Sequence, residues 1–171
     1  MYNASEVSRL LGLPLPQGPA PGSVEGFITF FDPGLSILDL RAVVASKGNT
    51  FCPQDWYDNE PFTHRDEAPR YRQVRLRPFP DSFRKTFAEQ QLLVPDGEEV
   101  PSARVMVTAL VVQFLATGQR LLESCSVHTA DVCPDGGRVY GGSSGRGGLY
   151  VLSRWDDIRD CNIGLASSRK F

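Results

Sequence analysis

The sequence lacks a long hydrophobic run and any excess of positive charge. No apolar stretch among its 171 residues approaches the roughly 20 that a helix needs to cross a bilayer, so we expect no membrane insertion. The net charge is -2 at pH 7, which argues against a dedicated nucleic-acid binder. The N-terminus shows no basic region followed by an apolar core. We therefore expect no signal peptide and a cytoplasmic protein, with surface display by another route left open.

Cysteine and histidine are also scarce, at four and two residues. The cysteines are spread too widely for a disulfide framework, and buried free thiols are the simplest interpretation. Cys125, His128 and Cys133 lie close enough in sequence to raise the possibility of zinc, but residues three apart on a strand point to opposite faces. We therefore expect no metal and no cofactor.

The same three residues leave an enzymatic alternative open, a hydrolase or oxidase that depends on Cys125, His128 or Cys133. Such a site needs a third orienting group and an oxyanion hole, and no local signal marks either His64 or His128 as a base. We expect a protein that is not an enzyme, with no catalytic residue.

The first 23 residues have a character of their own. Asn3 and Glu6 have the spacing of a capping box that opens a short helix, which Gly12 and Pro14 end. A stretch rich in proline and glycine follows as an arm. We divide the chain into residues 1–23, a helix and arm, and residues 24–171, a single domain. An assembly protein that uses the amphipathic N-terminal helix remains a further alternative.

Helices dominate the first part of the domain, and short strands dominate its end, a pattern that predicts an α+β fold. We expect helices over 35–45, 81–94 and 101–118, strands over 26–32 and 71–79 before Gly118, and strands over 120–132, 138–142, 148–153 and 162–171 after it. The helix that ends at Gly118 is apolar nearly all round, so it is expected in the core. Alternation in "YRQVRLRPF" places its arginines on the wet face of a strand.

Carboxylates gather near the end of the chain. Asp156, Asp157 and Asp160 lie beside Trp155 and could bind calcium, which prefers six or more oxygen ligands. The favoured interpretation is that the first two hold a loop through backbone N–H groups and Arg159. The preceding "GGSSGRGG" is interpreted as a hairpin tip, because no helix start follows it as a phosphate loop requires.

The segment "GGRVYGGSSGRGGLYVLSRWDDIRDCNIGLASSRKF" resembles the C-terminal part of C-type-lectin-fold proteins of the formylglycine-generating-enzyme type. Those proteins commonly contain an R-V-x-x-G-G-S segment, a polar loop and a terminal strand of the form N-I-G-F-R. The counterparts here are Arg138-Val139, Gly141 to Ser143, and Asn162 to Leu165. More specifically, the segment resembles the variable proteins of diversity-generating retroelements. The resemblance implies a C-type-lectin-like fold, with helices on short antiparallel strands and a C-terminal strand that closes the sheet.

In that family, adenine-directed mutagenesis rewrites Asn codons in a C-terminal segment, here about 138–162. Changes at those adenines alone can yield Tyr, Ser, Arg, Leu, Gly, Asp, Ile and Cys, whereas Trp155 cannot arise in this way and belongs to the scaffold. The expected ligand-binding surface comprises Tyr140, Ser143, Ser144, Arg146, Tyr150, Leu152, Ser153, Arg154, Trp155, Ile158, Asp160 and Cys161.

The composition of this segment favours binding independently of the resemblance. Tyr and Arg supply large contact areas at modest entropic cost, and Ser and Gly adapt their hydrogen bonding, as in antibody paratopes. We therefore predict a non-catalytic protein that binds an unknown protein or glycan ligand through a diversified surface. An ordinary glycine-rich loop region without a ligand is the plain alternative. The ligand and the oligomeric state stay open.

Overall fold

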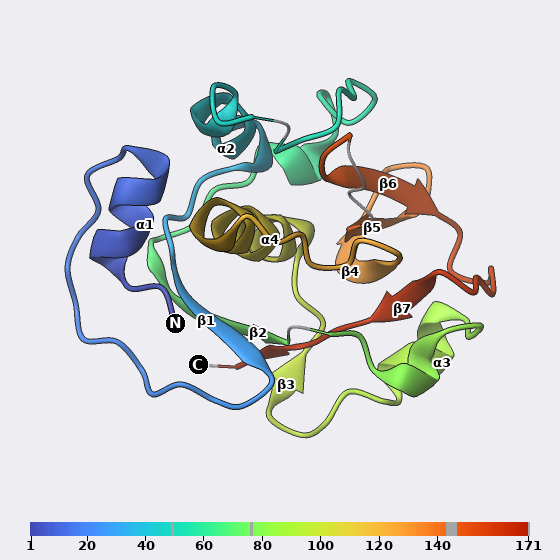
Figure 1. The fold of residues 1–171 in the computed structure, drawn as a ribbon. Coiled ribbons are helices and arrows are strands. Elements are labelled where there is room, and N and C mark those ends of the chain that lie inside the picture. The colour runs from blue at the N-terminus through green and yellow to red at the C-terminus, as the bar shows by residue number, and fades with distance from the viewer. Residues whose placement is uncertain (49, 76, 143–146, 171) are drawn as a thin grey trace.

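The structure is a computed structural model that describes residues 1–48, 50–75, 77–142 and 147–170. Four α-helices, two short 3-10 helices and eight strands make up the described chain, so the predicted α+β class is confirmed. The strands form two separate four-stranded sheets around a central helix (Figure 1). None of the described helices has the length and hydrophobicity that a bilayer crossing demands.

The N-terminal helix α1 (Ala4–Leu11) begins as the sequence predicts. The side chain of Asn3 accepts from the backbone N–H of Glu6, and the Glu6 carboxylate accepts from the N–H of Asn3. Gly12 ends the helix in the left-handed conformation. The apolar face of α1 is buried against β1 and α4, so the surface that suggested an assembly role is covered by the chain's own core.

The first sheet has the strand order β1-β2-β8-β3, built from β1 (Phe27–Asp32), β2 (Arg70–Arg75), β8 (Ser168–Arg169) and β3 (Glu98–Glu99). The expectation that the arginines of β2 lie on a wet face is wrong for Arg72, which is buried. Its guanidinium bonds to the buried carboxylate of Asp32 and to Glu67. Asp32 also receives two bonds of 2.9 Å from Arg104. Arg72 lies two residues before the buried Val74 and shares its face of the strand, and the ion pairs allow its charge to be buried there.

Helix α4 (Ala103–Thr117) lies at the centre and packs against strands of both sheets, as its all-round apolar sequence predicts. Ser102 caps its start and Gly118 ends it. Helix α2 (Ile37–Val44), capped by Ser36, packs on α4. The loop after α2 contains the 3-10 helix η1 (Pro61–Thr63) and is held by the buried side chains of Tyr57 and Phe62.

The helix expected over 81–94 is much shorter. A 3-10 turn, η2 (Pro80–Ser82), is followed by α3 (Phe87–Gln91), because Arg84 has a φ of 57° that interrupts a right-handed helix. Thr86 and Glu89 then form a capping box that restarts it. Phe87 and Gln90 face inward, whereas Gln91 is exposed.

The second sheet has the order β6-β5-β4-β7, with β6 (Tyr150–Arg154), β5 (Arg138–Gly142), β4 (Ser126–Val132) and β7 (Ile163–Leu165). The single C-terminal strand expected over 162–171 is divided: β7 pairs in parallel with β4, and β8 joins the first sheet. The chain thus passes from one sheet to the other. It runs close under η2, where a Cβ on Gly164 would lie 2.8 Å from Ser82 Oγ.

Candidate functional site

The register of β5 and β6 brings four predicted surface residues onto one face of the second sheet. Tyr140 lies opposite Leu152, and Arg138 lies opposite Arg154, while Tyr150 lies opposite Gly142. Because residues opposite each other in a sheet point to the same side, Tyr140, Tyr150, Leu152 and Arg154 share a face. We call this the outer face.

The alternate residues of the same strands point the other way. Val127, Val139 and Val151 are completely buried and pack in the core beneath α4. Small β-branched side chains suit this surface, because they fill the space between a sheet and a helix without polar atoms. The second sheet is therefore dry and apolar on one face and lined by tyrosine and arginine on the other.

A hollow of about 310 Å³ opens on the outer face. Tyr140, Tyr150 and Leu152 line it from the sheet, and Asp160 lines it from the loop after β6. The remaining lining residues are Ser124, Cys125, Ser126, Asn162 and Ile163. Tyrosine rings beside hydroxyl, amide and carboxylate groups give a concave surface with both apolar contact and hydrogen-bonding capacity.

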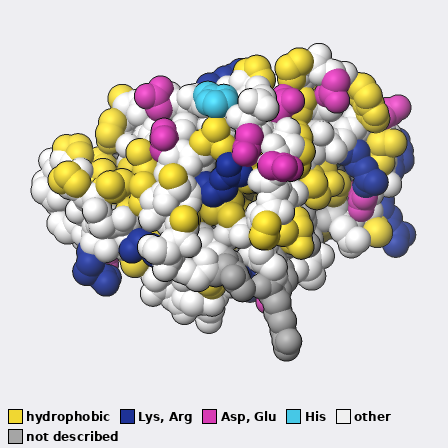
Figure 2. All heavy atoms as spheres, turned by 90° about the horizontal axis from the view of Figure 1, so that it is seen from above, with side chains coloured by type: hydrophobic (Ala, Val, Ile, Leu, Met, Phe, Trp, Pro, Cys, Tyr) yellow, Lys and Arg dark blue, Asp and Glu magenta, His cyan; other side chains and the backbone are white. Residues whose placement is uncertain are grey.

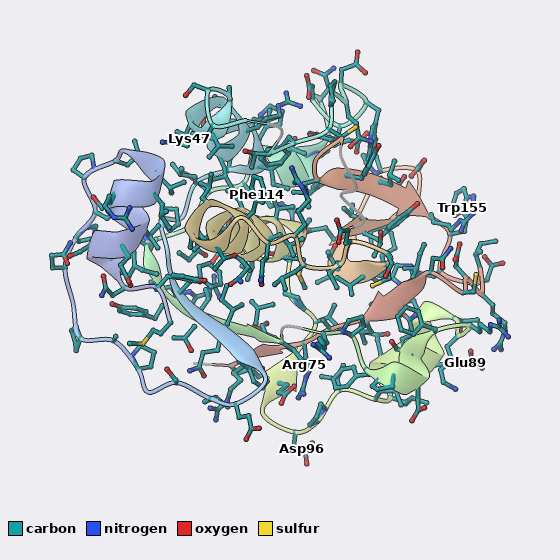
Figure 3. All side chains as sticks on the ribbon, viewed as in Figure 1. Lys47, Arg75, Glu89, Asp96, Phe114 and Trp155 are labelled. Carbon is teal, nitrogen blue, oxygen red and sulfur yellow. The ribbon has the colours of Figure 1, made fainter. Side chains whose placement is uncertain are left out.

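The loop 155–162 extends the outer face with large exposed side chains. Trp155 is 56% exposed and Ile158 is 39% exposed, and Cys161 is also exposed. Figure 3 shows Trp155 beyond the end of β6, on the side of the molecule that also carries Glu89 of α3. Exposed tryptophan is a frequent anchor in binding surfaces, because one rigid ring buries much area at small entropic cost.

Contacts from outside the loop hold its backbone in place. The carbonyl of Asp156 accepts from the N–H of Phe87 at 2.9 Å, and the carbonyl of Asp160 accepts from the N–H of Arg84 at 2.8 Å. Arg159 bonds to the Glu89 carboxylate at 2.7 Å. The loop is therefore preorganised, which lowers the entropy lost on binding.

Arg138 is the central support of this loop. Its guanidinium donates to both carboxylate oxygens of Asp156, at 2.6 and 2.9 Å, and its Cζ lies 3.6 Å from the centre of the Phe87 ring. The expectation that Arg159 supports the aspartates is thus wrong, because Arg138 performs this role and Arg159 pairs with Glu89. The described residues contain no cluster of three or more His, Cys, Asp or Glu arranged to hold a metal ion.

Two of the predicted residues pair with each other. The guanidinium of Arg154 donates to the carboxylate of Asp160, whose second oxygen accepts from the N–H of Asn162 at 2.7 Å. Burial raises the pKa of the adjacent Tyr140 hydroxyl, which stays neutral at physiological pH. The charges at the rim of the hollow are therefore balanced by one cation and one anion.

Ser153 does not join the outer face. It lies opposite Val139, on the other side of β6. Ser143, Ser144 and Arg146 lie outside the described residues. The structure thus brings Tyr140, Tyr150, Leu152 and Asp160 together around the hollow, with Arg154 paired to Asp160, and places Trp155, Ile158 and Cys161 on the adjoining loop.

The outer edge of β6 is covered by the segment that follows α2. The indole N–H of Trp56 donates to the carbonyl of Val151 at 2.8 Å, and the side-chain oxygen of Gln54 accepts from the Val151 N–H at 3.1 Å. Capping an edge strand in this way protects it from pairing with another chain and fixes the hollow's wall.

Seen from above in Figure 2, hydrophobic, acidic and basic side chains are mixed over the molecule.

The residues of the enzymatic alternative are not arranged as a nucleophile and its base. His128 Nδ1 lies 2.7 Å from the side-chain oxygen of Gln90, which is therefore its hydrogen-bond partner. Burial raises the pKa of Cys125, and it raises that of Cys133 to about 11. Both shifts disfavour the thiolate, the form that a catalytic cysteine needs.

Comparison with known proteins identifies no relative. No protein-family model matches the chain, and neither a curated protein nor a solved structure matches it. The proposed function therefore rests on the outer face itself.

Several residues of the site carry no signal of their own in the sequence. Arg138, which supports the loop, lies 18 positions before Asp156 in the sequence. Phe87, the other support, belongs to a separate helix. Ser124, Ser126 and Asn162 line the hollow only because β4 lies beside β5 and β7 lies beside β4. Their role depends on strand order, which local patterns do not encode.

Proposed function

We propose that this protein is a non-catalytic binder that recognises a protein or glycan ligand through the outer face and the loop 155–162. The observation that carries the proposal is the register of β5 and β6. It gathers Tyr140, Tyr150, Leu152 and Arg154 on the face that α4 does not cover, around a hollow. These residue types combine broad contact area with adaptable hydrogen bonds.

We further propose that the fold is C-type-lectin-like and that a retroelement diversifies the surface. Two features support the second idea. The residues that adenine-directed changes can produce lie mainly on the outer face and its loop, while Val127, Val139 and Val151 form the buried framework. The loop's main supports, Arg138 and Phe87, lie outside the predicted variable set, so the backbone can stay fixed while the surface changes.

The experiment that tests binding compares matched variants on an array of purified proteins and glycans. The wild-type chain is screened first, and each positive spot is then probed with Tyr140→Ser, Leu152→Ser and Asp96→Asn. Asp96 is exposed and lies far from the second sheet in Figure 3, so its variant is the control.

We expect the outer-face variants to lose at least about 10-fold in affinity, corresponding to about 1.4 kcal/mol. Asp96→Asn should bind as the wild type does. Binding that survives both outer-face variants, or that falls equally in all three, would place the ligand elsewhere or show that the contact is nonspecific.

A further inference from the structure

A buried histidine lies on the same side of the second sheet as the outer face, where α3 covers it. The imidazole of His128 is 2% exposed, and its strand neighbour across the β4–β5 ladder is Tyr140, whose ring lies edge-on at a centroid distance of 6.1 Å. On its other side the ring of Phe87 lies edge-on at 5.6 Å. His128 is thus enclosed between a residue of the binding surface and the residue that supports the loop.

The hydrogen bonds around Gln90 fix which nitrogen of His128 carries the proton. The Gln90 amide nitrogen donates to the carbonyls of Ser82 and Ile163, at 2.8 and 3.1 Å, which uses both of its hydrogens. Its oxygen therefore faces His128 Nδ1, and Nδ1 must donate. The proton of the neutral ring is on Nδ1, and Nε2 carries a lone pair.

Nε2 is buried and has no hydrogen-bond partner among the described residues. A proton added there would create a cation with no acceptor in a site closed to water, and burial accordingly lowers the pKa of His128 to about 4. The charged groups that act on the ring are two carboxylates and two guanidiniums, from β5, β6 and the loop: Arg138, Arg154, Asp156 and Asp160. Because these charges are of opposite sign, their effects on the pKa of His128 oppose each other, and burial remains the dominant cause of the shift.

We propose that His128 makes the binding surface acid-sensitive: its protonation favours a state in which α3 and the loop 155–162 have separated from the sheet. The geometry requires these two elements to move, because Phe87 and Gln90 of α3 cover the ring. Phe87 also holds the Asp156 carbonyl and lies under Arg138, so its displacement releases the loop. The inference rests on the proposed function, because the released loop is part of the proposed binding surface.

The size of the effect follows from proton linkage. In the open state the hydrated imidazole has its ordinary pKa of about 6.5, whereas in the closed state the pKa is about 4. Between about pH 7 and pH 5 the open state gains protons and the closed state does not. Its population relative to the closed state should rise about 20-fold over this range.

The test uses the full chain without any ligand. Hydrogen exchange of the Phe87 and Arg84 amides, which bond to loop carbonyls, is measured from about pH 7 to about pH 5 and corrected for the intrinsic pH dependence of exchange. The variant is His128→Asn, which keeps a donor near Gln90 and does not titrate. His64→Asn at the exposed second histidine is the matched control.

We expect the corrected opening constant to rise about 20-fold in the wild type and in His64→Asn, and to stay nearly constant in His128→Asn. An equal rise in all three would overturn the proposal and assign the effect to the carboxylates. If His128→Asn does not fold, the ring of His128 in the wild type is titrated by NMR. A pKa near the ordinary value of 6.5 in the folded chain would equally overturn it, because the closed state would then bind the proton as well as the open state does. Because no ligand is used, this outcome is independent of the array experiment.

Discussion

The two faces of the second sheet are built from the same strands but are chemically unlike. Along β6, Val151 is completely buried in the hydrophobic core, and the next residue, Leu152, lines the hollow on the outer face. The inner face carries Val127, Val139 and Val151 together with the small Gly141 and Ser153, whereas the outer face mixes tyrosine, leucine and arginine. A strand thus allows one surface to be held constant for folding while the other is free to vary for binding, because neighbouring residues point to opposite sides.

The largest effect should come from placing a charge on each face in turn. Val151→Asp buries a carboxylate against α4 and should cost at least about 4 kcal/mol of unfolding free energy, enough to leave much of the protein unfolded. Leu152→Asp, one residue further, should cost less than about 1 kcal/mol, because its carboxylate reaches solvent. Urea denaturation of both variants measures the difference. Similar losses would contradict the assignment of the two faces.

The pH dependence of stability should reveal His128, the buried histidine beside Tyr140. The folded-state pKa of His128, about 4, lies below its ordinary value of 6.5, so the unfolded chain binds the extra proton between these values. The stabilisation is present above about pH 6.5 and is lost as the pH falls towards about 4, by about 3 kcal/mol in total. The decrease should be missing in His128→Asn. A variant that loses stability in parallel with the wild type would assign the loss to other groups.

A smaller effect should distinguish a residue that supports the loop from a residue of the binding surface. Arg138→Gln removes both bonds to Asp156 and the contact with Phe87, and should cost about 1–2 kcal/mol while speeding exchange of the Phe87 amide. Arg154→Gln removes only a partly exposed ion pair with Asp160 and should cost less than about 1 kcal/mol. Chemical denaturation with amide exchange tests the pair. The reverse ranking would mean that the residues predicted to vary themselves support the loop.

Local signals in the sequence were sufficient for much of the fold. The capping box at Asn3, the apolar helix that ends at Gly118 and the short strands around residues 138–154 are each encoded by neighbouring residues. The residues of β5 and β6 that codon chemistry assigned to the surface lie on the outer face, with the exception of Ser153. Ser153 departs from this grouping because codon chemistry, unlike alternation, takes no account of the direction of a side chain.

The features that sequence reasoning missed depend on contacts between distant segments. Asp32 and Arg104 are buried as charges because each neutralises the other, which neither local pattern reveals. The C-terminal stretch looked like one strand because its alternation is continuous, yet it leaves β4 for the first sheet after Leu165. In the same way, the support of Asp156 by Arg138 depends on how β5 and the loop after β6 lie relative to each other.

The central claim is that the outer face varies while the framework is constant. Deep sequencing of the gene's 3′ end in a clonal population, together with the DNA just downstream, tests it most directly. We predict substitutions concentrated at the codons of the outer face and loop, such as Tyr140, Leu152 and Ile158, with Val139, Val151 and Trp155 unchanged. A near-copy carrying adenines at the variable positions should lie nearby. An invariant 3′ end without such a copy would contradict diversification.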